Sequence, residues 1–325
     1  MSSSTEIIEQ GGPDARARPA PSGGHIGDRV FRGMSAGAGI LLLLIMAAIA
    51  AFLIAEAIPA LQGNKANFFT TTTWNPDGEP SVFGIAALAF GTVLTSLIAL
   101  IIATPVAVGV ALFISHYAPR RLAAFLGYVV DLLAAVPSVV YGLWGLIFLV
   151  PVVQPAWQWI HDTLGFIPLF SADQVAGKSV LTGSLVLAIM ILPIIAAVSR
   201  EVFLQAPTSL QEAALGLGAT RWEMIRMTVL PFGKSGVVSA AMLGLGRALG
   251  ETIAVAMVLP AAFTVSFQLL NTNGNSIAAN IANTFAEAAE NGRGALIASG
   301  LVLFVITLVV NMAARLVVVR NRGDA

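Results

Sequence analysis

The sequence contains no cysteine and very little charge. Without cysteine it can form no disulfide, no iron–sulfur cluster and no cysteine-based zinc site. Only 10% of its 325 residues are charged, whereas 57% are hydrophobic. Several stretches of about twenty residues are almost free of charge, which is typical of helices that cross a bilayer. A soluble chain of this length would need a more polar surface. The composition therefore predicts an all-α integral membrane protein.

Six apolar stretches are each long enough to cross roughly 30 Å of hydrocarbon as a helix. We predict them at Ser35–Ala57, Val82–Ser115, Leu122–Val150, Ser179–Val198, Ser235–Leu259 and Ala295–Val318. The second and third exceed the length of one crossing, and we expect Pro105 and Pro137 to bend them. The predicted organisation is a flexible cytoplasmic tail (1–32), a first span with an outer loop (33–81), a five-helix core (82–318) and a second cytoplasmic tail (319–325).

Lysine and arginine residues are distributed unevenly between the two sides of the predicted membrane. With a cytoplasmic N-terminus, thirteen of the 17 lie in inner segments, and only Lys65, Lys178 and Arg293 lie in outer loops. The remaining one, Arg247, lies inside a span. Because positive charge favours the cytoplasmic side, both termini are predicted to be cytoplasmic.

The longest inner loop, residues 200–234, contains two capping-box patterns, Ser209–Glu212 and Thr220–Glu223. In each pattern a hydroxyl and a carboxylate satisfy free amides at the start of a helix. Gly216 and Gly218 lie between the two patterns, so we predict two short helices joined by a glycine turn. Such a pair suits the transmission of force from another protein, but it is equally suited to be a stiff connection between two spans.

Part of this loop resembles the EAA signature of bacterial ABC-importer permeases. The matching residues are Glu212-Ala213-Ala214, Gly218 and Thr228-Val229-Leu230-Pro231, with Thr228 where the family usually has Ile. The resemblance implies a type I ABC-importer permease fold, in which this loop is a cytoplasmic coupling helix seated on a separate ATPase subunit. It also implies that the residues at that interface are Glu212, Ala213, Ala214 and Gly218. Glu212 can act as a capping residue at the same time.

Two Gly-Lys-Ser triplets, at 177–179 and 233–235, raise the question of whether the chain itself binds ATP. A P-loop needs another glycine five positions earlier and a preceding strand, but these positions hold Ala172 and Thr228 between membrane helices. We therefore expect a non-catalytic subunit without a cofactor, with ATP and Mg²⁺ used by a partner chain. No nucleophile–base pair argues for an enzyme, and the isolated His116 and His161 do not predict a metal site.

Arg247 and Glu251 are charged residues near the middle of the fifth predicted span. An arginine at the bilayer centre costs on the order of 3 kcal/mol, and a spacing of four residues places both side chains on one helix face. A guanidinium matches phosphate oxygens, and a carboxylate can accept a proton that phosphate retains and sulfate lacks. We therefore favour a substrate path over a neutralised pair that locks two helices together. Gly246 and Gly250 are predicted to admit a neighbouring helix.

The segment Gly246–Thr252 after an EAA loop resembles the phosphate-specific (Pst) permeases, and Ala134–Gly145 is similar to their C subunit rather than their A subunit. The resemblance covers about residues 82–260. It implies a phosphate importer in the bacterial plasma membrane, in which this chain pairs with an A-type permease, two ATPase subunits and an external phosphate-binding protein, without nucleic acid. Two alternatives stay open: a permease for another oxyanion such as sulfate or molybdate, and a proton-driven secondary transporter with Glu251 as carrier.

Three further features are less specific. Asp131 lies near membrane depth, where it either faces the path or a partner charge or takes part in helix packing. Trp157 and Trp159, in a predicted outer loop, suit an interfacial belt. Ser276–Glu290 is predicted to be a short outer helix ended by Gly292, either a docking surface or a cap on the membrane surface.

Overall fold

The computed structural model describes residues 26–322, and it confirms a membrane protein built from helices. In these residues, six helices are long and apolar enough to cross a membrane. The chain divides after Ala50 into two parts, which we describe separately. The first part holds the beginning of α1 (Ile26–Gly63), whose apolar side chains are largely exposed. Helix α1 starts earlier than the predicted span, so residues 26–32 of the predicted tail are helical, and residues 1–25 lie outside the described part.

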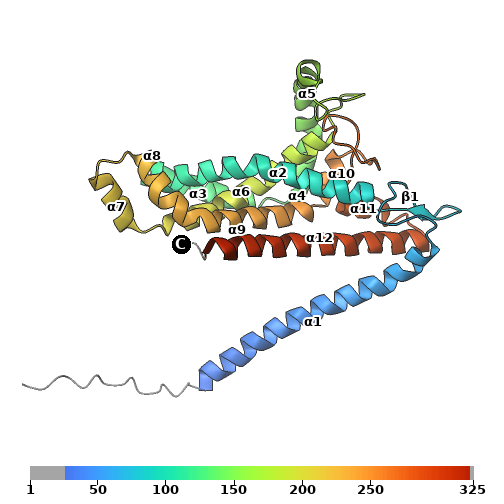
Figure 1. Cartoon of the computed structure of the whole chain (residues 1–325), viewed down its shortest axis with the longest axis horizontal. Helices are drawn as coiled ribbons and strands as arrows, with labels where there is room; N and C mark the ends of the chain where they lie inside the picture. Colours follow the sequence, from blue (N-terminus) through green and yellow to red (C-terminus); the bar gives the residue numbers. More distant parts are fainter. Residues whose placement is uncertain (1–25, 323–325) are drawn as a thin grey trace, which may run out of the picture. The chain divides into compact units, whose positions relative to one another are not determined.

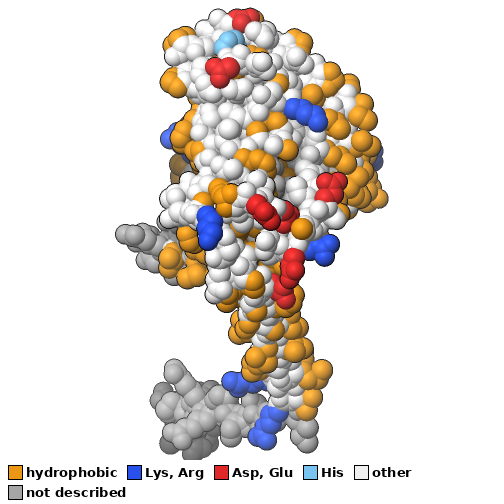
Figure 2. Space-filling view, turned by 90° about the vertical axis from the view of Figure 1, so that its right-hand side faces the viewer, with side chains coloured by type: hydrophobic (Ala, Val, Ile, Leu, Met, Phe, Trp, Pro, Cys, Tyr) orange, Lys and Arg blue, Asp and Glu red, His pale blue; other side chains and the backbone are white. Residues whose placement is uncertain are grey.

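The second part is a bundle of long helices that lie alongside one another (Figure 1). Its members are α2 (Ala86–Leu112), α6 (Val180–Leu204), α9 (Leu230–Leu249) and α12 (Glu290–Arg322). The π-helix η1 (Phe113–Tyr117) continues α2. Hydrophobic side chains are spread over the visible surface and charged ones are few (Figure 2), as expected of a protein surrounded by lipid.

Small residues allow the bundle helices to approach closely. On α2, alanines recur every four residues, so they form one face of the helix that is fully buried: Ala99, Ala103, Ala107 and Ala111. At Gly244 of α9, an added Cβ would come within 2.8 Å of the Ile195 side chain of α6. Small residues at such contacts provide the close van der Waals packing that holds membrane helices together.

The third predicted span, Leu122–Val150, is wrong in its boundaries because the helix breaks before Pro137. The structure instead has α3 (Arg120–Ala134), α4 (Ser138–Trp144), the π-helix η2 (Gly145–Leu149) and α5 (Val150–Leu164). Proline lacks the amide hydrogen that a continuous helix needs, so Pro137 ends one helix rather than bending it. Helix α5 runs across the direction of α2 and α9 (Figure 1). By length and composition, the membrane-spanning helix in this region is Ser138–Leu164.

The two tryptophans of the predicted outer loop therefore lie in α5. The Trp157 indole donates a 2.7 Å hydrogen bond to the Thr182 hydroxyl of α6, whereas the Trp159 side chain is 65% exposed. Trp157 thus joins α5 to the bundle, and of the two only Trp159 has the exposure expected of an interfacial residue.

The fifth predicted span, Ser235–Leu259, is also interrupted. Helix α9 ends at Leu249, residues 250–252 are not helical, and α10 (Ile253–Val258) follows. Before α9, the chain forms α7 (Thr208–Gly216), α8 (Arg221–Met224) and the π-helix η3 (Ile225–Val229). These short helices confirm the predicted helix pair in the loop 200–234.

At the other end of the bundle from α7, the chain forms a small hairpin and a short helix (Figure 1). Strands β1 (Trp74–Asn75) and β2 (Val82–Phe83) pair antiparallel, and α11 spans Ile277–Thr284 with Ser276 as its N-cap. The predicted helix Ser276–Glu290 is therefore too long, and Gly292 lies inside α12 rather than ending a helix. Residues Ile277–Asn280 are buried, so α11 packs into the bundle instead of capping its surface.

Candidate substrate path and coupling loop

The two interrupted spans meet at their breaks. Helix α4, which follows the break at residues 135–137, packs on α10, which follows the break at 250–252. A Cβ on Gly142 would come within 2.7 Å of the Ala254 Cα, and one on Gly145 within 3.3 Å of the Val258 side chain. In a membrane, non-helical backbone is tolerated only where protein buries it or where it lines a cavity. Two adjacent breaks therefore mark a part of the bundle that is built for more than crossing the bilayer.

Two side chains satisfy backbone groups at the breaks. The Tyr141 hydroxyl donates a 3.0 Å hydrogen bond to the Leu133 carbonyl at the end of α3. The Glu251 carboxylate accepts a 3.2 Å hydrogen bond from the amide of Ala254 in the first turn of α10. Both side chains are buried, and Glu251 is only 8% exposed. Because an unpaired backbone group costs several kcal/mol in the membrane interior, these bonds stabilise the breaks.

Arg247 lies in the last turn of α9, and Glu251 lies just beyond the helix end. The two residues therefore do not share one helix face, and the expected pairing is wrong: in residues 26–322, no ion pair within 4.0 Å joins them. Arg247 is half-buried, and the Glu251 side chain is buried.

Gly246 and Gly250 were predicted to admit a neighbouring helix, but in the described part of the chain no other helix approaches them closely. A Cβ on Gly246 would meet only the Asn311 side chain at 4.0 Å, and one on Gly250 only the backbone of its own helix. Gly250 is exposed. The surface next to Arg247 is therefore open on this side in the described part of the chain.

The loop with the EAA residues is a helix–turn–helix unit. Helix α7 ends in a Schellman motif: Gly218 has a φ of 89°, its amide donates to the Leu215 carbonyl at 3.0 Å, and the Ala219 amide donates to the Ala214 carbonyl at 3.1 Å. There is space around Gly218, since an added Cβ would meet no atom within 4 Å. The positive φ, rather than crowding, is what requires glycine at this position.

One of the two predicted capping boxes is confirmed and the other is wrong. Thr220 and Glu223 exchange the expected bonds at the start of α8, with the Thr220 amide donating to the Glu223 carboxylate at 2.8 Å. Helix α7, however, begins at Thr208 and has Pro207 as its N-cap, so Ser209 lies inside the helix and Glu212 cannot cap it. The Pro207 side chain has no hydrogen-bond acceptor, so α7 begins without a side-chain cap.

Three of the four predicted interface residues lie on the surface. Glu212, Ala213 and Gly218 are exposed, whereas Ala214 packs against a buried cluster that includes Phe203 and Ile225. Large apolar side chains are exposed next to them: Leu210, Leu215 and Leu217, the last of which is 90% exposed. An exposed group of this kind is typical of a surface that another protein covers.

An ion cluster missed by the sequence analysis joins α3 to α6. The Arg200 guanidinium lies 2.8 Å from the Glu201 carboxylate and 3.5 Å from that of Asp131. Gly127 makes room for it, because a Cβ there would overlap the guanidinium. Asp131 thus faces a partner charge, which was one of the predicted possibilities. The cluster lines a cavity of about 550 Å³ between α3 and the C-terminal end of α6.

The two Gly-Lys-Ser triplets have ordinary structural positions. Ser179 is the N-cap of α6 and accepts a 3.3 Å hydrogen bond from the Thr182 amide. Lys234 and Ser235 lie inside α9. Neither triplet follows a strand, so neither has the context of a phosphate-binding loop.

Comparisons with known proteins agree on one family. Residues 103–323 match the family model described as "Binding-protein-dependent transport system inner membrane component". The chain is 47% identical over 294 residues to "Phosphate transport system permease protein PstC 2" of Mycobacterium tuberculosis, covering 89% of this chain and 91% of that protein. It is 45% identical over 305 residues to the PstC permease of Mycobacterium leprae, covering 91% and 96%.

A solved structure shows the same fold. A chain of the inward-facing MetNI methionine ABC transporter superposes with a TM-score of 0.53 at 16% identity, covering 72% of this chain and 96% of that one. At this identity the likeness concerns the fold alone. It supports the ABC-importer permease architecture predicted from the EAA loop.

Proposed function

The chain belongs to the binding-protein-dependent transport system inner membrane components, and within them to the PstC phosphate permeases, and from this we propose how it takes part in transport. It is a multi-pass membrane protein and a permease subunit of an ABC phosphate importer. We propose that Arg247 and Glu251 lie in its phosphate path. The names of the relatives favour phosphate over sulfate or molybdate, and membership of this family goes against a proton-driven secondary transporter.

The observation that carries the proposed path is the half-buried Arg247 beside a helix break. A guanidinium is the side chain that best matches phosphate oxygens. Its own chain supplies no carboxylate within 4.0 Å in the described residues, so its charge is available to an anion. Interrupted helices near the middle of a bilayer are a common way of building such a site. Glu251, four residues on, can accept the proton that phosphate retains.

The proposed coupling surface consists of Glu212, Ala213, Ala214 and Gly218. Its support is the exposed helix α7 with its uncovered leucines, together with the rigid Schellman turn that follows. The partner that fits is a separate ATPase subunit, which would use ATP and Mg²⁺, while this chain holds no cofactor. The importer would contain two copies of this ATPase subunit and an external phosphate-binding protein. An A-type permease would pack on the open side of Gly246 and Gly250.

The proposed topology has both termini in the cytoplasm of the bacterial cell. Its support is the excess of lysine and arginine on the side of α7. This orientation would put α7 where an ATPase has access to ATP, and the β1–β2 hairpin where an external binding protein can reach it.

Reconstitution tests the proposal. The chain is purified with its partner subunits, placed in vesicles, and assayed for uptake of phosphate and of sulfate with and without ATP. We expect phosphate uptake that requires both ATP and the ATPase subunits, with little uptake of sulfate. Uptake by this chain alone, without an ATPase, would contradict the proposed coupling.

A further inference from the structure

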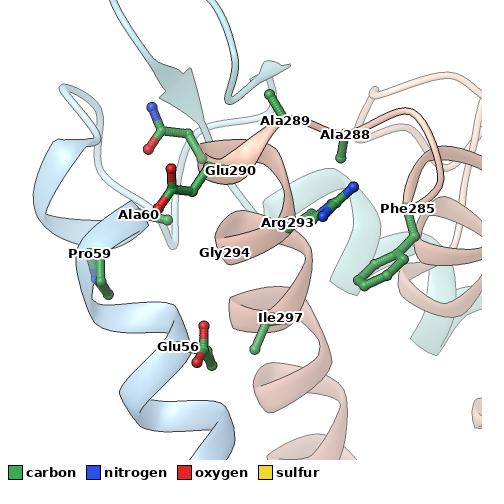
Figure 3. A pocket seen from close by; sticks show the side chains of 11 residues that line it. Glu56, Pro59, Ala60, Phe285, Ala288, Ala289, Glu290, Arg293, Gly294 and Ile297 are labelled. Atoms are coloured by element: carbon green, nitrogen blue, oxygen red, sulfur yellow. The ribbon is translucent and has the colours of Figure 1, made fainter.

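Helices α1 and α12 touch at the end of α1, and a cavity of about 520 Å³ lies beside the contact (Figure 3). A Cβ on Gly294 would come within 2.7 Å of the Ala60 Cβ and 3.4 Å of the Glu56 carbonyl oxygen. Ala57, Ala60 and Ala295 are buried at this contact. The two helices therefore pack closely beside the cavity. Its volume lies in the range of ordinary small-molecule sites.

Charged groups of both signs line this cavity. The carboxylates of Glu56 and Glu290 face the gap between α1 and α12, whereas Arg293 extends toward Phe285 (Figure 3). Within residues 26–322, none of these three side chains makes an ion pair shorter than 4.0 Å. The amides at the start of α12 are already engaged, because Asp77 accepts hydrogen bonds from Ala289 and Gly292 at 3.1 and 2.7 Å. Arg293 therefore supplies the positive charge of the cavity.

The apolar surface of α1 beside the cavity, close to the end of the helix, indicates a position near the boundary between hydrocarbon and water. Glu56 precedes the end of α1 at Gly63 by about 10 Å along the helix axis. The neighbouring Phe52, Ile54 and Ile58 are exposed, as expected of a helix surface in contact with lipid. A carboxylate at this depth is costly unless a polar partner reaches it. Lipid headgroups are the polar groups present at this boundary.

We propose that this cavity binds the headgroup of a zwitterionic phospholipid that has a free ammonium group, as phosphatidylethanolamine does. The ammonium would lie against Glu56 and Glu290, and the phosphate against Arg293. Both contacts are charge-assisted hydrogen bonds, which are the strong ones. Phosphatidylglycerol has a phosphate but no ammonium group, so it would leave the two carboxylates without a cation. Phosphatidylcholine has a cation, but its trimethylammonium group has no N–H to donate to them.

Lipid retention by the purified importer complex tests this proposal without any transport measurement, so its outcome is independent of the phosphate path. The complex is equilibrated in detergent with equal amounts of phosphatidylethanolamine, phosphatidylglycerol and phosphatidylcholine of identical acyl chains. Bound lipid is then counted by native mass spectrometry. We expect phosphatidylethanolamine to be preferred, and the preference to fall at least about tenfold in Glu56→Gln and in Arg293→Gln, as for one lost charge-assisted bond.

Matched controls are Glu79→Gln and Lys65→Gln, which remove exposed charges from the same end of the protein but do not line the cavity. They should retain the wild-type preference. Equal retention of the three lipids by the wild-type complex would overturn the proposal, and this measurement does not depend on the folding of any variant. Unchanged lipid preference in both cavity variants, with weaker binding of a purified soluble partner, would overturn it in favour of a protein-docking site.

Discussion

The Cα of Ala254 in α10 lies so close to Gly142 in α4 that a Cβ on Gly142 would come within 2.7 Å of it. Each of these helices follows a break in its span, so the contact joins the two interrupted parts of the bundle. Tyr141 and Glu251 form hydrogen bonds to backbone groups next to this junction, and Arg247 lies in the last turn of α9, before the second break. The packing of α4 on α10 therefore determines where the charged residues of the proposed path stand.

Replacing Gly142 by valine should disturb this junction. The added atoms meet backbone rather than the end of a flexible side chain, so α4 and α10 must separate. Overpacking of this kind costs about 1–3 kcal/mol. We expect a lower melting temperature of the detergent-purified complex and reduced phosphate uptake. Gly109→Val is the matched control, because an added Cβ at Gly109 of α2 would meet nothing within 4 Å. Equal melting temperatures for the two variants would contradict the close contact.

Arg247→Gln should abolish phosphate uptake while the complex still assembles. The amide retains much of the volume and polarity of the side chain but lacks the charge that holds an anion. Uptake of radiolabelled phosphate and size-exclusion chromatography of the complex are measured on the same preparation. Normal uptake would show that Arg247 lies outside the path. Failure to assemble would assign it a structural role instead.

Two substitutions at Glu251 separate its capping role from its charge. Glu251→Gln keeps an oxygen that can accept the hydrogen bond from the Ala254 amide, so assembly and stability should be close to wild type. The ability to accept a proton from phosphate is lost, and discrimination against sulfate should fall about tenfold or more. Competition between phosphate and sulfate for uptake into vesicles measures this discrimination.

Glu251→Ala removes the acceptor as well as the charge. The Ala254 amide is then left without its partner at the start of α10, which should cost about 1–2 kcal/mol of stability. A thermal melt of the detergent-purified complex compares the two variants. If both lose the same stability, the hydrogen bond does not support the break.

The number of spans could be predicted because hydrocarbon excludes charge, and this leaves a signal in every helix that crosses it. The breaks could not. Pro137 looks the same in sequence whether it bends a helix or ends it, and residues 250–252 interrupt a segment that stays mostly apolar. A break is possible only where the freed backbone groups find partners, and here the Tyr141 hydroxyl and the Glu251 carboxylate supply two of them.

The same limit applies to the site. Arg247 was visible as a charge inside an apolar stretch, but its predicted pairing assumed a continuous helix. Tyr141 gave no signal, because a tyrosine among apolar residues is ordinary in a membrane helix. Asp131 and Arg200 are 69 positions apart, and only the packing of α3 on α6 brings them together. The EAA loop was the most predictable part, since its turn depends on local residues such as Gly218.

Gly218→Ala should weaken the coupling of ATP hydrolysis to transport. A φ of 89° is unfavourable for alanine, and the strain costs about 1 kcal/mol or more, so the turn between α7 and α8 should shift. We expect an assembled complex that transports less phosphate for each ATP hydrolysed. Gly216→Ala is the control, because Gly216 ends α7 in helical conformation with no atom within 4 Å of an added Cβ. Equal coupling ratios in the two variants would contradict a role for the turn.

The Asp131–Arg200 pair should contribute little by charge and more by packing. Asp131 is 54% exposed as a side chain, so water screens its attraction to the 15%-exposed Arg200. A double-mutant cycle with Asp131→Asn and Arg200→Gln should therefore give a coupling energy below about 1 kcal/mol. Arg200→Gln alone should destabilise the complex more than this, because the guanidinium fills the space that Gly127 leaves open. Chemical denaturation of the four proteins measures both quantities. A coupling energy of several kcal/mol would mean that the pair is shielded from water in the assembled importer, and it would place this end of α3 beneath a partner subunit.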